Sequence, residues 1–140
     1  QHVLSIVNEN DTVSTDEVTA LDHFGDNDTL SAVVSQLVHA DLLIILTDRD
    51  GFYDGNPKER DDCKLIDTVT ELTDEIWNYA GGEGSKLGTG GMRTKLNAAD
   101  IATNSGIHMV LANGEDPFNV FKILHGENVG TLFVKKDRNE

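Results

Sequence analysis

Residues 88–95 (GTGGMRTK) carry the residue types best suited to binding a phosphate group. Six glycines occur between positions 81 and 91, and a pattern typical of a helix follows them without a break. Glycine allows backbone N–H groups to approach an anion closely, and the start of a helix adds partial positive charge. Lys95, which we expect in the first turn of this helix, adds a full charge. The segment therefore predicts a site for a nucleotide phosphate, with a flexible surface linker as the alternative.

This glycine-rich segment matches neither of the two common nucleotide-binding fingerprints. A Walker A loop needs a Gly-Lys-Ser/Thr sequence, whereas Lys95 follows Thr94 and Lys86 follows Ser85. The dinucleotide fingerprint needs a third glycine at the position that Leu87 occupies. We therefore expect the phosphate to be bound by a different arrangement of the backbone.

Three polar clusters lie close to predicted strands or helices, at positions 8–11 (NEND), 25–28 (GDND) and 47–51 (TDRDG). In the first cluster, Asp11 would suit the ammonium group of a small substrate, and the amides would align its carboxylate. The second has three polar residues before a predicted helix, although one N-cap needs only one. This excess indicates a second role, in substrate binding or in placing a catalytic group. The alternative for each cluster is a polar turn or a helix cap, which Asn and Asp also favour.

The elements that must position these clusters alternate between strand and helix. Apolar runs predict strands, and apolar residues at helical spacing predict helices. The five aliphatic residues at 42–46 are typical of a strand buried on both faces of a parallel sheet. The predicted strands are 3–7, 42–46, 108–112 and 131–134, the predicted helices are 29–38, 73–80, 93–105 and 118–124, and residues 51–65 form an irregular excursion with a hairpin.

The strands predicted at 3–7, 42–46 and 108–112 each run into polar residues. In open α/β sheets, ligands bind beyond the carboxyl ends of the strands, so we expect the polar clusters and the glycine segment at one edge. The chain enters a core-like strand almost at once and offers only three or four strands, which is few for a doubly wound domain. We therefore expect an N-terminal portion of the domain to be missing from this sequence.

The composition argues against two classes of partner. The 140 residues, a length typical of one domain, include 25 Asp and Glu against 11 Lys and Arg, which gives a formal charge of −14. A chain this acidic repels the backbone of nucleic acids and anionic membrane surfaces. No apolar run approaches the roughly 18 residues of a membrane span, and we find no signal peptide. The single cysteine, Cys63, excludes an intramolecular disulfide and fits a reducing compartment, so the expected location is the cytoplasm.

Taken together, these segments resemble the amino acid kinase family, and within it the members that phosphorylate L-glutamate. The matching stretches are IVNENDTVSTDEV, FGDNDTLSAVVSQLVHADLLIILTDRDGFYDGNP, GGEGSKLGTGGMRTKLNAADIATNSGI and GENVGTLFV, which cover nearly the whole chain in the family's order. The resemblance implies ATP-dependent phosphorylation of the glutamate side-chain carboxylate to γ-glutamyl phosphate, in the first step of proline synthesis. It also implies an α/β fold (an αβα sandwich with a mainly parallel sheet), Mg²⁺ as a cofactor, a homo-oligomer, and often feedback inhibition by proline.

The resemblance also implies roles for individual residues. Asp11 and Asn27 would hold glutamate, with Asn8 and Asp26 close by. Asp28 would organise the catalytic groups, and Lys95 would neutralise charge on the transferring phosphoryl group. No protein residue is assigned to the metal. The nucleotide contacts fall on Thr47 and Asp48 and on a continuous run of Thr89, Gly90, Gly91, Met92, Arg93, Thr94 and Lys95.

One departure from the family bears on activity. The family's N-terminal part supplies a first phosphate-binding glycine loop, another catalytic lysine and a serine that contacts glutamate, and this sequence lacks it. The resemblance places residues 1–134 in the C-terminal portion of a kinase domain, followed by a charged and disordered tail at 135–140. These 140 residues alone are therefore expected to be inactive. Two other functions stay open: a family member with a different acceptor, and a non-catalytic module that binds a nucleotide or an amino acid.

Overall fold

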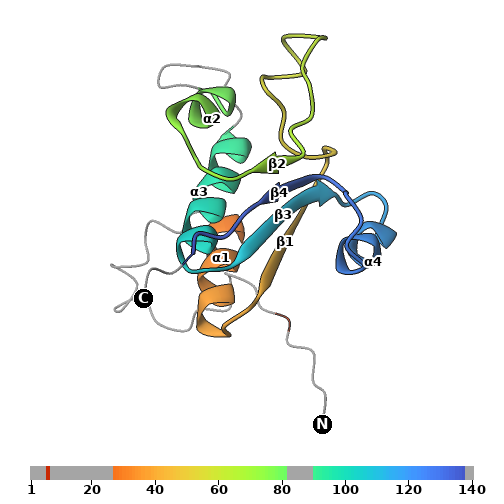
Figure 1. Cartoon of the computed structure of the whole chain (residues 1–140). Helices are drawn as coiled ribbons and strands as arrows, with labels where there is room; N and C mark the ends of the chain where they lie inside the picture. The colour runs from red at the N-terminus through yellow and green to blue at the C-terminus, as the bar shows by residue number, and fades with distance from the viewer. Residues whose placement is uncertain (1–5, 7–26, 82–89, 138–140) are drawn as a thin grey trace, which may run out of the picture.

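The computed structural model describes residues 6, 27–81 and 90–137 of the chain (Figure 1). Helices and strands follow one another in the order α1 (Asn27–Leu37), β1 (Leu42–Thr47), β2 (Thr68–Val69), α2 (Asp74–Tyr79), α3 (Gly90–Asn104), β3 (His108–Asn113), α4 (Phe118–Leu124) and β4 (Thr131–Phe133). Within the described residues, no helix combines the length and the apolar character that crossing a bilayer requires.

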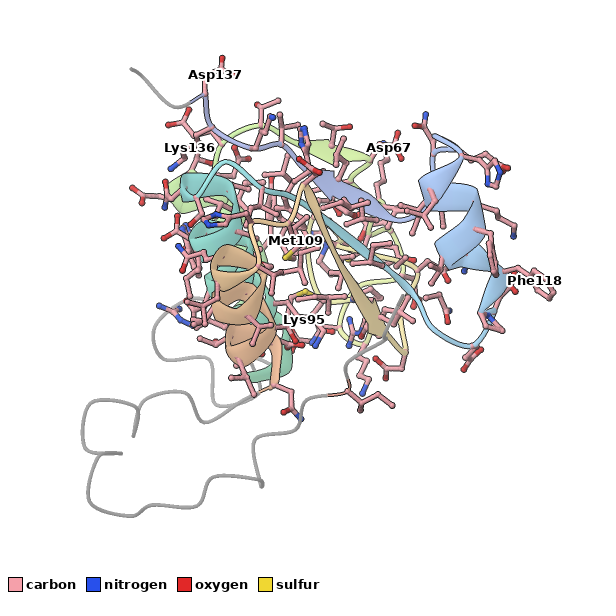
Figure 2. The ribbon with its side chains drawn as sticks, turned by 90° about the horizontal axis from the view of Figure 1, so that it is seen from below. Asp67, Lys95, Met109, Phe118, Lys136 and Asp137 are labelled. Atoms are coloured by element: carbon pink, nitrogen blue, oxygen red, sulfur yellow. The ribbon has the colours of Figure 1, made fainter. Side chains whose placement is uncertain are left out.

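The four strands form one mixed sheet in the order β1-β3-β4-β2. The pairs β1–β3 and β2–β4 are parallel, and β3–β4 is antiparallel. Helices α1 and α3 lie side by side on one face of the sheet, and α4 lies on the other face (Figures 1 and 2). The α/β prediction is therefore confirmed. The antiparallel pair makes the sheet mixed, and it brings the start of β4 to the carboxyl ends of β1 and β3.

The core fills the space between the sheet and the α1–α3 layer. Small residues of α1 and α3 let the two helices and the sheet approach closely, because alanine adds almost no bulk. Leu96, Met109 and Leu111 are fully buried, and burying a side chain of this size stabilises the fold by about 1.5–3 kcal/mol. The alanines that carry the close approach are Ala32, Ala98, Ala99 and Ala102, all at 0% exposure.

Strand β1 is less buried than its all-aliphatic sequence predicts. Within β1, only Ile45 falls among the buried residues, and Leu46 is 45% exposed. The physical reason is the position of the strand: within the described part of the chain, β1 is an edge strand that pairs on one side only, with β3. The prediction of burial on both faces is wrong for the described residues.

Most predicted elements are confirmed within one to three residues, and the end signals act as expected. Thr73 accepts a hydrogen bond from the Ile76 N–H at the start of α2, and Gly106 ends α3 with a φ of +77°. Residues 52–66 contain the predicted hairpin, with Tyr53 bridged antiparallel to Leu65. The two-residue strand β2 was not predicted, since it is too short to show an apolar pattern.

Three further expectations concern the ends of the chain and of α3. The strand predicted at 3–7 lies outside the described residues, except for an exposed Ile6. Helix α3 begins at Gly90, three residues earlier than predicted. The tail was expected to be disordered from residue 135, but Lys136 donates a side-chain hydrogen bond to Asn104 Oδ1 at 2.7 Å. Its backbone N–H also donates to the Thr103 carbonyl at 3.0 Å, so this part of the tail is attached to α3.

Candidate functional site

The first turn of α1 and the second turn of α3 meet at a lysine–aspartate ion pair. Lys95 Nζ lies 2.9 Å from Asp28 Oδ2, and the hydroxyl of Thr94 lies 3.0 Å from the same oxygen. The lysine side chain is 16% exposed and the aspartate 20%. Figure 2 shows Lys95 beside these two helices. Because the pair is mostly shielded from water, the charge-assisted hydrogen bond contributes about 1.5–3 kcal/mol, more than an open surface pair would.

Local structure explains why these side chains are available at this point. Asp28 lies in the first turn of α1, where the helix dipole stabilises a carboxylate. Lys95 was predicted in the first turn of α3, but the helix begins at Gly90, so Lys95 is its sixth residue. Gly90 and Gly91, which were expected in the loop, are instead the first two residues of α3. The ammonium of Lys95 therefore lies one turn inside α3 and faces α1.

The ion pair fixes the position of the Lys95 ammonium but uses only one of its hydrogen-bond donors within the described residues. An ammonium group has three N–H donors, and Asp28 is the one described acceptor that takes a bond from Lys95. The hydroxyl proton of Thr94 is shared between Asp28 Oδ2 and the Gly91 carbonyl, which is 2.8 Å away. The arrangement therefore fixes a positive charge at the start of α3 while its remaining donors can bind an anion.

The carboxyl ends of the parallel strands β1 and β3 lie side by side at one edge of the sheet. Thr47 pairs with Asn113 in the parallel register, and the Gly114 N–H donates to the Thr47 carbonyl at 2.8 Å. The Thr47 hydroxyl donates to Asp48 Oδ1 at 3.1 Å. Asn113 Nδ2 donates across to Asp50 Oδ1 at 3.0 Å. The expected gathering of polar residues beyond the strand ends is thus present for β1 and β3.

A pocket of about 340 Å³ opens between this edge and the first turn of α3. One wall is the segment that follows β1, including Arg49, Phe52 and Tyr53. The opposite wall is the end of α2 with the turn after it, residues 78–81, and Met92 closes the pocket from α3. Arg49 has no ion-pair partner among the residues described. The pocket is therefore bounded by both the strand-end cluster and the end of the glycine-rich segment.

Two tyrosines, Tyr53 and Tyr79, line this pocket, and their hydroxyl groups stay protonated at neutral pH. Burial, together with the carboxylate of Asp50, raises the pKa of Tyr53 above its usual range. A hydrogen bond to Glu75, with Oη 2.5 Å from Oε1, raises the pKa of Tyr79. Both phenols therefore keep their protons at neutral pH and act there as neutral hydrogen-bonding groups.

The structure brings together only part of the predicted site. Asp28, Thr94 and Lys95 are joined directly, and Met92 lines the pocket. Gly90 and Gly91 form the start of α3, Asn27 is exposed at the start of α1, and Thr47 and Asp48 lie at the strand ends, outside the pocket lining. The other predicted site residues, Asn8, Asp11, Asp26 and Thr89, lie outside the described residues.

Arg93 has a local role in the described structure. Its guanidinium lies 5.7 Å from the centre of the Trp77 ring, and Nη1 approaches the Gly81 carbonyl at 3.5 Å. A cation over an aromatic ring contributes about 0.5–1 kcal/mol at an exposed site. Arg93 therefore ties the start of α3 to the end of α2, the two elements that form one side of the pocket.

Several pocket residues were not predicted as site residues. Tyr53, Tyr79 and Gly81 line it, as do residues 54–56. Tyr53 belongs to the LTD-x-DG-x-Y-D element on which the family resemblance rests, so a signal was present for it. Tyr79 lies two residues before Gly81, the first of the six glycines, but nothing in its spacing distinguishes it from a core aromatic.

The described residues contain no group of three or more His, Cys, Asp or Glu side chains that could hold a metal ion. Mg²⁺ in phosphate-transferring sites needs only one or two carboxylates, because substrate phosphates and water supply the other ligands. The carboxylates in the described part of the chain are therefore compatible with a Mg²⁺ whose other ligands are substrate phosphates and water.

If the protein phosphorylates glutamate as the resemblance implies, we expect the Thr94→Val substitution to lower kcat/KM for glutamate about three- to tenfold. It removes one of the two donors to Asp28 Oδ2, and a hydrogen bond of this kind contributes about 1 kcal/mol. Steady-state kinetics of the complete polypeptide that contains this chain would measure the change. Thr94→Ser keeps the hydroxyl and should stay within twofold of the parent. Equal losses in both variants would contradict a role for the hydroxyl.

The chain matches one protein family over most of its length. Residues 1–113 fit the family described as "Amino acid kinase family". The chain is 57% identical over 134 residues to "Glutamate 5-kinase" of Clostridium perfringens, covering 96% of this chain and 50% of that protein. It is 54% identical over 136 residues to "Glutamate 5-kinase" of Clostridium acetobutylicum, covering 97% and 49%. The chain therefore spans about half the length of the curated relatives it matches.

Solved structures support the same fold. Uridylate kinase from Archaeoglobus fulgidus superposes with a TM-score of 0.58 at 25% identity, covering 76% of this chain and 46% of that one. N-acetylglutamate synthase from Neisseria gonorrhoeae gives a TM-score of 0.60 at 23% identity, covering 79% and 24%. At these identities the likeness concerns the arrangement of the sheet and helices.

Proposed function

Because the chain belongs to the amino acid kinase family, we propose that the protein containing it transfers the γ-phosphoryl group of ATP to the side-chain carboxylate of L-glutamate. The product would be γ-glutamyl phosphate, the first intermediate on the route to proline. The relatives with 50–57% identity over almost all of this chain carry the name of this enzyme, which favours glutamate over the other acceptors used in the family.

The observation that carries the proposal is the ion pair between Lys95 and Asp28. Phosphoryl transfer demands little covalent chemistry from a protein, and depends on alignment and on cations around the transferring group. Glutamate and ATP are both anions, and the chain itself carries a charge of −14. A fixed and partly buried ammonium at the start of α3 is therefore the feature that such a reaction requires.

The nucleotide is assigned to the 340 Å³ pocket and the start of α3. In this proposal the neutral tyrosines face the base and ribose, and the N–H groups at Gly90 and Gly91 face the phosphates, with Lys95 reaching the γ-phosphoryl group. Mg²⁺ is bound mainly by the phosphates of ATP and offsets their charge. Glutamate would be held by Asn27 together with Asn8, Asp11 and Asp26, three residues that lie outside the described part of the chain.

Three further properties complete the proposal: a homo-oligomeric state, inhibition by proline and a cytoplasmic location. The support for each is the similarity to the curated relatives. We also propose that the 140 residues alone are inactive, because they span only about half the length of those relatives.

Formation of γ-glutamyl hydroxamate with ATP, Mg²⁺ and hydroxylamine tests the proposal. The complete polypeptide that contains this chain should give product with L-glutamate and not with L-aspartate or N-acetylglutamate. Turnover with another acceptor alone would point to a different member of the family. Tight ATP binding without any turnover would favour a non-catalytic binding module.

A further inference from the structure

Thr131 is a fully buried polar residue at the start of β4. Its hydroxyl accepts a hydrogen bond from the Phe52 N–H at 2.8 Å and donates one to the Ile66 carbonyl at 2.6 Å. The side chain is at 0% exposure. One hydroxyl therefore satisfies a donor and an acceptor that lie 79 and 65 residues away along the chain. A valine at this position would keep the shape and leave both backbone groups unpaired.

The two groups that Thr131 holds are the ends of the hairpin at 52–66. Inside this hairpin the Ile66 N–H donates to the Phe52 carbonyl at 2.8 Å, and the Asp54 N–H donates to the Lys64 carbonyl at 3.0 Å. Thr131 extends this ladder by bonding the outer N–H of Phe52 and the outer carbonyl of Ile66. The open end of the hairpin is thereby fixed to β4.

Close packing at the adjacent glycine shows how tightly this end is held. A Cβ atom placed on Gly51 would lie 2.7 Å from Thr131 Oγ1 and 2.9 Å from Leu65 Cδ1. Real side chains do not approach this closely, so the hairpin backbone rests directly on the Thr131 hydroxyl. Three consecutive residues of the same strand, Phe52, Tyr53 and Asp54, then line the 340 Å³ pocket, whereas Thr131 does not.

We propose that Thr131 is a positioning residue for the nucleotide site, because it fixes the hairpin that forms one wall of the pocket to β4. The inference rests on the proposed function in assigning the pocket to ATP. Without the hydroxyl, the Phe52 N–H and the Ile66 carbonyl would lose their partner, and hydrating them would require the hairpin to move away from β4. The pocket wall that the hairpin forms would then shift. The effect should fall on ATP binding and spare the glutamate side of the site.

Thr131→Val in the complete polypeptide tests this role, with Thr103→Val as the matched control. Thr103 is also buried, at 4% exposure, but it lies in the last turns of α3, remote from the pocket lining. We expect Thr131→Val to raise KM for ATP about tenfold or more while kcat and KM for glutamate change less than threefold. Thr131→Ser, which keeps the hydroxyl, should restore KM for ATP to within about threefold. Thr103→Val should leave it unchanged, whatever it does to the melting temperature.

Two outcomes would overturn the inference: a KM for ATP within twofold of the parent in Thr131→Val, or the same rise in Thr103→Val. If Thr131→Val does not fold, Thr131→Cys replaces it, because a thiol is a weak donor and acceptor. A rise of about threefold in KM for ATP is then expected, and no rise overturns the inference. Titration with a fluorescent ATP analogue gives the same comparison as a Kd. The inference can therefore fail or stand even if glutamate is not the acceptor.

Discussion

Replacing Lys95 with alanine should lower kcat for glutamate phosphorylation by about a thousandfold or more, measured by hydroxamate formation with the complete polypeptide. Removing one fixed group that stabilises developing charge typically costs 10²–10³ in rate, and removing a full cation from a phosphoryl-transfer site costs about 10³–10⁵. Lys95 is held by Asp28 at 2.9 Å, and Lys95→Ala removes this fixed positive charge. KM for glutamate should change far less than kcat.

The matched control for this substitution is Lys122→Ala. Lys122 also forms an ion pair, with Asp116 at 3.1 Å, but it is 41% exposed and lies on α4, on the opposite face of the sheet. Its removal should leave kcat within twofold of the parent. Lys95→Arg keeps the charge on a wider group and should retain part of the activity. A Lys95→Ala variant that folds and keeps more than a tenth of the parent rate would contradict the role given to this lysine.

The Gly130→Ala substitution should destabilise the fold by about 3 kcal/mol or more, which a urea unfolding curve of the complete polypeptide would measure. Gly130 has a φ of +72°, and a Cβ atom there would lie 2.1 Å from the Leu111 carbonyl oxygen. That oxygen belongs to the β3 backbone beside β4, so neither chain can move aside without breaking the pairing of the two strands. The substitution also displaces Thr131, the next residue, and with it the hairpin wall of the pocket.

Gly126→Ala separates the two causes of this loss. Gly126 has a similar φ of +81°, but a Cβ atom there would meet nothing within 4 Å. The variant should therefore lose only the cost of a left-handed backbone, about 1–2 kcal/mol. Equal losses at the two glycines would show that the contact with the Leu111 carbonyl does not limit stability.

Sequence patterns predicted the elements that have long periodic or apolar runs. The aliphatic run at 42–46 gave β1, apolar spacing gave α1, and Pro117 and Gly106 marked a helix start and a helix end. The predicted start of α3 is three residues too late, because glycine disfavours helices and the pair Gly90-Gly91 indicates a loop in sequence. The two-residue strand β2 exists because it pairs with β4, and a partner so far along the chain leaves no local signal.

In the site, too, local sequence patterns predicted single residues but not the contacts between residues that are far apart in the chain. Composition and spacing pointed to Lys95 as a phosphate-binding cation, but its pairing with Asp28, 67 residues away, has no local pattern. Asp28 entered the predicted site through the family resemblance. Thr131 belongs to the GENVGTLFV stretch that resembles the family, but its spacing did not indicate a role for it. A single threonine in an apolar strand looks the same in sequence whether its hydroxyl joins two distant backbone groups or faces water.

Within the described part of the chain, one side of β1 has no strand partner, which bears on how the 140 residues behave in solution. An edge strand of the sequence LLIILT has no charge, proline or bulge, the devices that normally prevent edge-to-edge association. Wherever this edge stays uncovered, backbone N–H and C=O groups are open to strands from neighbouring molecules. The high negative charge of the chain opposes such growth at low ionic strength, and added salt screens that repulsion. The segment on its own should therefore form intermolecular β-sheet more readily as salt concentration rises, whereas an added strand on β1 would remove the template.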